Sequence, residues 1–261
     1  MENKDIINSC VKEGTDLVGI TKIGDLPQTH PKRSPKDIHP GAKSIIVFAL
    51  KHSYGALESP TMRVMINETL SIYLELNRIG YRLSRFLEKN GFGGTTVHLA
   101  YPVEMSEDTR GLIGDLSFRH AASSAGLGFI GKSKLLITPE FGPRVRLAAV
   151  ITDAALDSNT KRIETKCSTC NISIEMCSAK ATSFEGVDVR RCAKVVGGPA
   201  GLNSLLRFFT EVVDKSKEEV KKMIRSSLVW SFHQAFQVGI SYDCHACMSC
   251  CPLGKEGKKA L

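Results

Sequence analysis

The chain has 261 residues, a formal net charge of +8 and nine cysteines. No stretch reaches the roughly 18 uninterrupted apolar residues that a membrane span needs, and the N-terminal MENKDIINSC has no basic region followed by an apolar run. We therefore expect no membrane segment and no secretory signal, and we predict a cytoplasmic protein, in which clustered thiols bind metal in preference to forming disulfides. The moderate positive charge suits an anionic partner such as a nucleic acid, or it is simply a solvated basic surface.

The first part of the chain predicts a helix, a loop and a buried strand. Residues 1–23 indicate a helix and then a short apolar run, with Cys10 as a small buried hydrophobe. Prolines spread through residues 24–41 predict a loop. Residues 44–50 form a continuous apolar run rich in β-branched side chains, typical of a strand buried on both faces. His52 and Tyr54 follow this strand, where α/β folds often bind ligands, so they are candidate cofactor contacts; an ordinary polar loop is the alternative.

The middle of the chain predicts one long helix and several strands. From residue 67 to 89 the apolar side chains recur three and four positions apart, which is one face of a helix. Residues 115–125 indicate a second helix that Asp115 caps and Gly126 ends. Three further strands are predicted, over residues 95–101, 135–137 and 146–151. Because helices and strands interleave throughout, we predict an α/β (α+β) core domain over residues 1–160.

Residues 161–261 form the second predicted domain, which holds eight of the nine cysteines. Two helices, expected at 203–213 and 216–236, make a helical insertion over about 200–238 between the two groups of cysteines. Ser216 and Glu219 have the spacing of a capping box that opens the second of these helices.

The cysteines of the second domain have the spacing of metal ligands. The first group is Cys167-x2-Cys170-x6-Cys177, and the second is Cys244-x2-Cys247-x2-Cys250-Cys251-Pro252, with Cys192 between them. Structural zinc commonly takes two Cys-x2-Cys pairs, whereas two-cluster ferredoxins use Cys-x2-Cys-x2-Cys-x3-Cys-Pro. The Cys-x3-Cys-Pro ending of the second group therefore favours iron–sulfur clusters over zinc.

Ser173 stands where the third cysteine of the first group belongs. Either Cys250 substitutes for it, or one iron has a non-cysteine ligand or an open position. His245 lies inside the second group and could donate a hydrogen bond to a cluster sulfur, which would tune the reduction potential.

These motifs together resemble a known family. The Cys-x2-Cys pairs, Cys192 behind two arginines and the Cys-x3-Cys-Pro ending look like the double-cluster domain of epoxyqueuosine reductases and corrinoid reductive dehalogenases. Residues 40–50 resemble the first core strand of that family, and residues 125–142 resemble its cobalamin-contacting region. The similar segments run in the same order from about residue 40 to residue 252.

The resemblance implies a nitroreductase-like corrinoid-binding core followed by a ferredoxin-like domain with two [4Fe–4S] clusters. One cluster would be held by four thiols: Cys177, Cys192, Cys244 and Cys247. The other would be held by Cys167, Cys170 and Cys251. Cobalamin or another corrinoid would lie in the core against a segment of seven residues: Gly126, Leu127, Gly128, Phe129, Ile130, Gly131 and Lys132.

Two physical properties of this segment suit a corrinoid. Its glycines would let the backbone approach a large flat ligand, because no Cβ intrudes. Lys132 could meet phosphate or amide groups of the ligand. The alternative is a plain helix C-cap and turn.

Three residues ahead of this segment are candidates for catalytic proton transfer. Arg119 and His120 lie on the predicted helix, and an imidazole titrates near neutrality. Asp115 lies near the acidic proton donor of epoxyqueuosine reductases, although it is not aligned with it. A surface or interhelical role is the alternative for Arg119 and His120.

We therefore expect an iron–sulfur oxidoreductase that passes electrons from two clusters to a bound corrinoid and on to a small-molecule substrate or a partner corrinoid protein. A redox protein would donate the electrons. The chain ends nine residues after Pro252, before the region with which epoxyqueuosine reductases hold tRNA, so we do not expect tRNA as a partner. The alternatives are an iron–sulfur electron carrier without a corrinoid and a zinc-stapled nucleic-acid-binding module.

Overall fold

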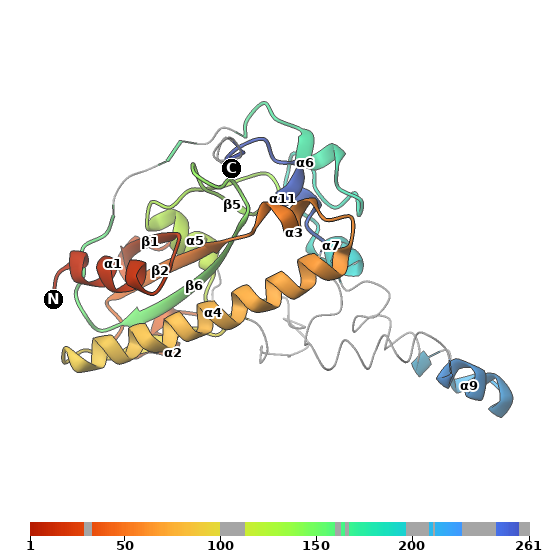
Figure 1. Ribbon diagram of the computed structural model, residues 1–261, viewed down its shortest axis with the longest axis horizontal. Coiled ribbons are helices and arrows are strands. Elements are labelled where there is room, and N and C mark those ends of the chain that lie inside the picture. Colours follow the sequence, from red (N-terminus) through yellow and green to blue (C-terminus); the bar gives the residue numbers. More distant parts are fainter. Residues whose placement is uncertain are drawn as a thin grey trace.

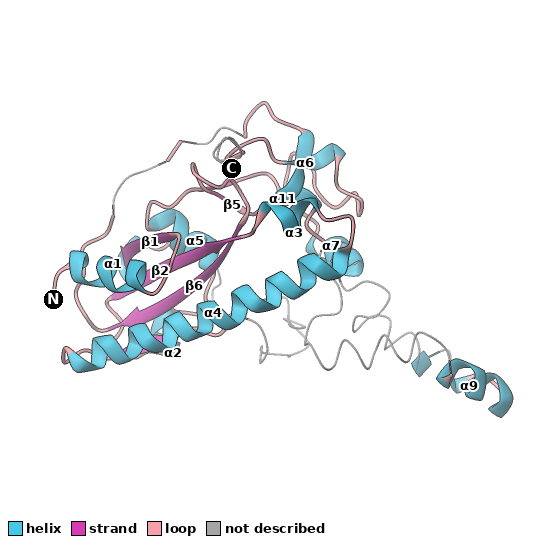
Figure 2. Cartoon of the chain, viewed as in Figure 1, coloured by secondary structure: helices cyan, strands magenta, loops and turns pink. Residues whose placement is uncertain are grey.

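The centre of the molecule is a four-stranded antiparallel sheet with helices on both faces (Figures 1 and 2). The computed structural model describes residues 1–28, 33–99, 113–159, 163–164, 167–196, 209–210, 212–225 and 244–255. The strand order is β1 (Leu17–Lys22), β2 (Ser44–Lys51), β6 (Val145–Thr152) and β3 (Gly94–Thr96). Helices α1 (Asn3–Lys12) and α4 (Met62–Lys89) cover one face, and α5 (Phe118–Ser124) covers the other. The predicted mixed α/β core is confirmed.

Strand β2 lies in the middle of the core because its side chains are apolar on both faces. Ile46 and Phe48 pack in the cluster of α1 and α4, and Ile45 and Val47 pack in the cluster of α5. The alternation follows from the two-residue repeat of a strand. Burying each of these side chains contributes roughly 1.5–3 kcal/mol, so the strand anchors both layers. The prediction of a strand buried on both faces is confirmed.

Helix α4 presents one continuous apolar face to the sheet. Its buried side chains recur three and four residues apart, from Met65 through Leu76 and Leu83 to Leu87. The helix begins at Met62, five residues before the predicted start, because Met65 packs in a separate apolar cluster with Met248 of the second cysteine group. The N-terminal turns of α4 thus belong to the contact between the core and the cysteine-bearing region.

Two predictions about local structure are corrected. Part of the expected loop over 24–41 is helical: η1 (Ile23–Asp25) precedes α2 (Pro35–Ile38), which Ser34 and Asp37 cap reciprocally. Asp115 does not cap α5, which begins only at Phe118, because its carboxylate pairs with a distant arginine instead. Strand β3 covers only the start of the predicted strand 95–101; residues 100 and 101 lie outside the described residues.

The remaining elements belong to the cysteine-bearing region and its link to the sheet. A hairpin of β4 (Phe129–Ile130) and β5 (Leu136–Ile137) precedes β6, and α3 (Tyr54–Glu58) follows β2. Helices α6 (Ile172–Glu175), α7 (Val189–Val196) and α11 (Ala246–Cys250) gather beside α3 at one end of the sheet (Figure 1). The division of the chain near residue 160 stays a prediction.

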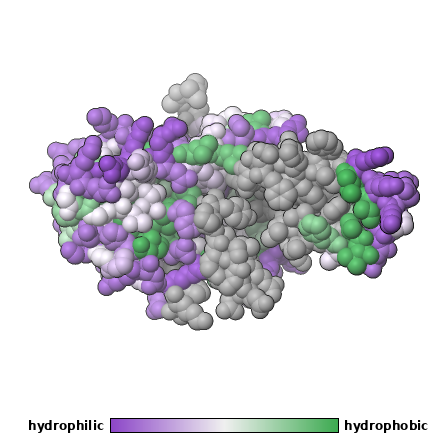
Figure 3. Space-filling model, turned by 90° about the horizontal axis from the view of Figure 1, so that it is seen from below, coloured by the Kyte–Doolittle hydropathy of each residue, from purple (hydrophilic) through white to green (hydrophobic). Residues whose placement is uncertain are grey.

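Helix α9 (Lys217–Ile224) begins with the capping box of Ser216 and Glu219, as predicted. Residues 200–208, 211 and 226–238 of the predicted insertion lie outside the described residues. Seen from below, the end of the molecule that carries α9 shows apolar side chains beside hydrophilic ones (Figure 3), and Phe209, Val213 and Ile224 are exposed there. None of the helices in the described part of the chain combines the length and the apolar character needed to cross a bilayer.

Candidate functional site

The predicted metal-binding cysteines are brought together at one end of the sheet. Cys251 is buried against Phe129 and Ile137 of the β4–β5 hairpin, and Cys167 packs against the same cluster. Helix α11 ends at Cys250 and packs against α6, which lies in the loop between Cys170 and Cys177. Residues far apart in the sequence therefore form one site.

The thiols fall into two electrostatic neighbourhoods. The pKa of the Cys247 thiol is raised to about 11, first by burial and then by charge on four nearby thiols: Cys177, Cys250, Cys244 and Cys192. Burial also raises the pKa of the Cys251 thiol, and there the thiols that add to the effect are those of Cys167 and Cys170. Cys250 borders both neighbourhoods, because the pKa of its own thiol is raised by burial and then by charge on Cys251 and Cys170. The other members coincide with the two ligand sets that the family resemblance implies. Ligation itself stays a prediction.

The fold stabilises the thiolate form of Cys177. Its burial raises the pKa, but hydrogen bonds from the backbone after it, led by that of Ala181, outweigh burial and lower the pKa below its ordinary value. The Ala181 amide donates to the Cys177 Sγ over 3.2 Å. Since the thiolate is the form that binds iron, this residue is suited to ligation.

Within the described residues, no group of three or more His, Cys, Asp or Glu side chains is arranged so that it could hold a metal ion. Whether these residues suit an iron–sulfur cluster can instead be judged from the buried polar atoms of the second cysteine group. The Nδ1 of His245 and the Oγ of Ser249 are buried without a hydrogen-bond partner in this part of the chain. Buried polar groups left unpaired are costly, and cluster sulfurs accept hydrogen bonds. The thiol donors and these two orphaned atoms fit an iron–sulfur group.

The β4–β5 hairpin holds the first cysteine group. Lys132 Nζ donates to the carbonyl oxygens of Ser168 and Cys170 over 3.1 and 2.9 Å and to Asn171 Oδ1 over 3.2 Å. The ammonium also lies 4.7 Å from the centroid of the Phe184 ring. Lys132 thus fixes the backbone of the turn that carries Cys170.

The glycines of the predicted corrinoid segment approach protein rather than open space. A Cβ on Gly128 would lie 2.3 Å from the carbonyl oxygen of Ile137, and a Cβ on Gly131 would meet the Ile137 side chain at 2.4 Å and the Cys167 Sγ at 3.2 Å. Leu127 and Phe129 are buried in the core clusters. The absence of a Cβ on these glycines lets the hairpin close and lets Cys167 approach it. A corrinoid contact of the segment from Gly126 to Lys132 stays a prediction.

His52 and Tyr54 also make contacts within the protein. His52 is buried, with its Nδ1 2.9 Å from Glu68 Oε2 and its Nε2 accepting from Arg146 Nε over 3.0 Å. The Tyr54 hydroxyl donates to the carbonyl oxygen of Gly254 over 3.4 Å. These residues support the end of the sheet on which the cysteine-bearing loop docks, and their predicted cofactor contact stays untested.

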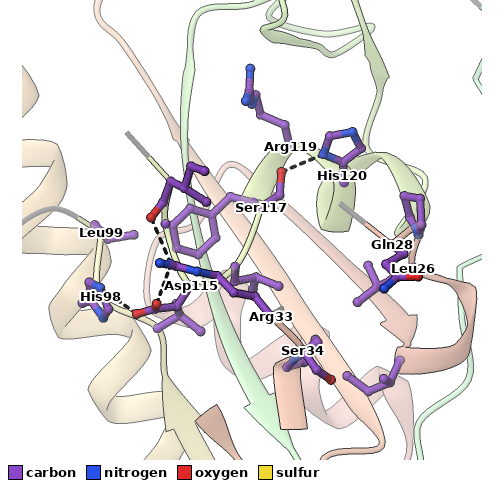
Figure 4. Close-up of a pocket in the computed structure, with 18 residues that line it drawn as sticks. Leu26, Gln28, Arg33, Ser34, His98, Leu99, Asp115, Ser117, Arg119 and His120 are labelled. Carbon is purple, nitrogen blue, oxygen red and sulfur yellow. Dashed lines mark hydrogen bonds and ion pairs between the residues drawn. The ribbon is translucent and has the colours of Figure 1, made fainter. Parts of the chain in front are cut away.

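The predicted catalytic residues line a cavity of about 660 Å³ on the α5 face of the sheet (Figure 4). Asp115 lies in its wall, 2.8 Å from Arg33 Nη1 and 3.3 Å from His98 Nε2. His120 and Arg119 line the same cavity, so the structure brings together all three residues chosen from the sequence. The volume falls in the range of small-molecule sites.

His120 forms a hydrogen bond with Ser117, with 2.7 Å between the His120 Nδ1 and the Ser117 Oγ (Figure 4). Burial lowers the pKa of His120, and the positive charges of Arg119 and Lys134 lower it further. Arg119 donates to the carbonyl oxygen of Lys134 in the β4–β5 hairpin. The cavity wall and the cysteine-bearing turn are thus attached to the same hairpin.

Three important residues were not chosen from the sequence. Arg33 and His98 complete the ion pairs of the cavity, and Arg33 lies in a segment read only as loop. Arg144 is buried and donates to the carbonyl oxygens of Cys251 and Leu253, the latter over 2.7 Å. The sequence signal for Arg144 was its position directly before a buried strand. The two residues of the C-terminal loop that accept its hydrogen bonds lie more than 100 residues away in sequence.

No protein-family model matches the chain. The tetrachloroethene reductive dehalogenase of Dehalobacter restrictus is 32% identical over 146 residues, which are 55% of this chain and 24% of that protein. The epoxyqueuosine reductase of Bacillus cereus is 26% identical over 243 residues, which are 88% of this chain and 53% of that protein. The chain thus spans about half the length, or less, of the curated relatives it matches.

Solved structures of both kinds share the fold. An epoxyqueuosine reductase in complex with a modified tRNA-Tyr stem loop has a TM-score of 0.63 and 21% identity, over 97% of this chain and 65% of that one. A reductive dehalogenase described as B12-dependent has a TM-score of 0.58 and 18% identity, over 73% of this chain and 28% of that one. The mixed α/β architecture with its antiparallel sheet is common to all three. The resemblance stated from the motifs is confirmed.

Proposed function

From this resemblance to epoxyqueuosine reductases and reductive dehalogenases, we propose that the protein is an iron–sulfur oxidoreductase. Electrons would pass from two [4Fe–4S] clusters to a bound corrinoid and on to a small-molecule substrate or a partner corrinoid protein. The proposal includes the finer architecture, a nitroreductase-like core followed by a ferredoxin-like domain. The observation that carries it is the β4–β5 hairpin, which contacts the cysteines on one side and the cavity residue Arg119 on the other.

The cysteines supply the ligands of this proposed centre. Cys177, Cys192, Cys244 and Cys247 would hold one cluster, and Cys167, Cys170 and Cys251 would contribute to the other. Bound clusters of this type supply one-electron transfer at a potential set by burial and by hydrogen bonds to sulfur. His245 and Ser249, whose polar atoms are buried and unpaired among the described residues, would donate such bonds.

The cavity supplies proton-handling groups for a small substrate. Asp115 is held at the wall by Arg33 and His98, and Figure 4 shows the three side chains converging there. The lowered pKa of His120 favours the neutral imidazole at neutral pH, so this residue suits accepting or relaying a proton. Apolar side chains, among them Leu26 and Leu99, complete the wall and limit access of water.

The corrinoid in this proposal rests on the relatives, one of which is described as B12-dependent. On the side where a Cβ would stand, Gly128 and Gly131 pack against the hairpin. The segment from Gly126 to Lys132 would contact the corrinoid through its remaining surface. A redox protein as electron donor is part of the proposal, and tRNA is not.

Anaerobic purification followed by iron and sulfide analysis and EPR tests the proposal. We expect iron and acid-labile sulfide for two clusters, about eight of each per chain, with absorption near 400 nm that reductant bleaches. Cys244→Ala should lower the iron content and abolish electron transfer, whereas Cys10→Ala, a buried thiol remote from the site, should leave both unchanged. Stoichiometric zinc without sulfide would overturn the proposal.

A second candidate, an iron–sulfur electron carrier without a corrinoid, is favoured by the packed glycine segment. Adding cobalamin to the cluster-loaded protein separates the two. A change in the corrinoid spectrum and a raised unfolding temperature support the first candidate. Neither effect, with clusters intact, supports the second.

A further inference from the structure

One predicted cluster lacks a ligand. A [4Fe–4S] cubane takes four protein ligands, but the set of Cys167, Cys170 and Cys251 supplies three, because Ser173 occupies the position of the fourth. A serine hydroxyl is a poor substitute, since it stays protonated at neutral pH and is a harder donor than the thiolates that iron–sulfur clusters prefer. The cluster therefore needs another donor or keeps an exposed iron.

Helix packing places a spare thiol opposite this position. Ser173 lies on α6, and α6 packs against α11, which ends at Cys250 (Figure 1). The two cysteine groups thus meet through the two short helices that carry these residues. Cys250 is the one thiol of the second domain that neither implied ligand set uses.

The local backbone leaves Cys250 available. Its Sγ is half-buried and donates to the carbonyl oxygen of Cys247 over 3.7 Å, which is a weak contact for a thiol donor. Helix α11 ends at Cys250, and the extended backbone of Cys251 begins directly after it. Cys251 packs against Phe129 and Ile137 of the hairpin.

We propose that Cys250 replaces the cysteine missing at position 173 and completes the ligand set of Cys167, Cys170 and Cys251. The inference rests on the proposed iron–sulfur function and assigns the fourth ligand of one cluster. It makes the cluster fully thiolate-bound, so this site transfers electrons and has no open iron for a substrate.

Iron analysis and EPR on four anaerobic preparations test this assignment: the wild type, Cys250→Ala, Ser173→Cys, and the double variant. The wild type should hold two four-iron clusters. Cys250→Ala should lose one iron per chain and show a three-iron signal after mild oxidation, because one corner of the cubane has no ligand. The double variant should regain the iron and lose the signal, since a thiol returns at position 173. Ser173→Cys alone should match the wild type.

Controls keep the outcomes distinct. Cys10→Ala should match the wild type, and Cys250→Ser, which preserves side-chain size, shows whether loss of iron in Cys250→Ala comes from lost packing. Circular dichroism of each variant reports folding. Two intact four-iron clusters in Cys250→Ala would overturn the assignment while leaving the proposed function in place. A wild type without iron would overturn both.

Discussion

His120 shows how single side chains set the chemistry of the cavity. Its pKa is lowered mainly by burial and then by the charges of Arg119 and Lys134. A lowered pKa means that the folded chain binds this proton more weakly than the unfolded chain does. His120 therefore reduces stability as the pH falls below about 6.5, the ordinary value for histidine.

Replacing Arg119 by glutamine should raise the pKa of His120, because one positive charge is removed. The value should stay below the ordinary one, since burial, the largest cause, remains. NMR titration of the imidazole signals, with His120→Gln to assign the signal, measures the change. Arg85→Gln, at an exposed position on α4, is the matched control and should have no effect. An unchanged pKa in Arg119→Gln would show that the charge does not reach the imidazole.

The sequence indicated which residues belong to the candidate site more accurately than it indicated what those residues contact. The spacing of the cysteines was sufficient to find the thiols that the fold gathers at one end of the sheet. The role of Gly128 was not predictable, because a small residue is needed equally for a flat ligand and for the carbonyl oxygen of Ile137. Asp115 was expected to cap a helix, and only the fold shows that Arg33 approaches it from far away in sequence.

At the scale of elements, the period of the apolar residues predicted which helices and strands pack in the core. It did not predict contacts between residues far apart in the sequence. Strand β2 and helix α4 were recognised because their apolar residues repeat every two residues and every three to four. Helix α2 was missed because proline suggests loop, although proline at the first helical position after a serine cap is favourable. The β4–β5 hairpin is too short for a periodic signal, and its function depends on the residues that pack against it.

Lys132 is the residue through which this hairpin holds the first cysteine turn. Lys132→Met removes three hydrogen bonds to residues 168–171 while keeping most of the apolar side chain. A hydrogen bond from a charged donor contributes about 1.5–3 kcal/mol, so the loss of even one of these bonds should speed cluster loss at least about tenfold. The decay of absorbance near 400 nm in the presence of an iron chelator measures the rate.

Lys89→Met, at the exposed C-terminal end of α4, is the control for lost positive charge. It should lose its clusters at the wild-type rate. Equal rates in Lys132→Met and the wild type would mean that the turn is held by its thiols alone.

At the scale of the whole molecule, the core and the cysteine-bearing loop form one structure. The loop after Cys251 docks on the end of the sheet, where the Tyr54 hydroxyl and the Arg144 guanidinium donate to its carbonyl oxygens. Met65 of α4 and Met248 of α11 pack in one apolar cluster at the same junction. The cysteine site is therefore fixed to the sheet that positions the cavity.

Arg144 is the strongest of these attachments. It is 3% exposed and joins the carbonyl oxygens of Phe141, Leu253 and Cys251. In Arg144→Met all three lose their donor, one in a buried and two in a part-buried place, and the free energy of unfolding should fall by roughly 3 kcal/mol. Arg144→Lys should recover only a minor part, because an ammonium cannot reproduce the planar fork that reaches several acceptors. Anaerobic urea unfolding of the cluster-loaded protein measures both changes.

Arg85→Met, at an exposed site, is the control, and its free energy of unfolding should stay within about 0.5 kcal/mol of the wild type. If Arg144→Met also stayed within that range, the loop would be held by its cluster ligands, and the core would not depend on it.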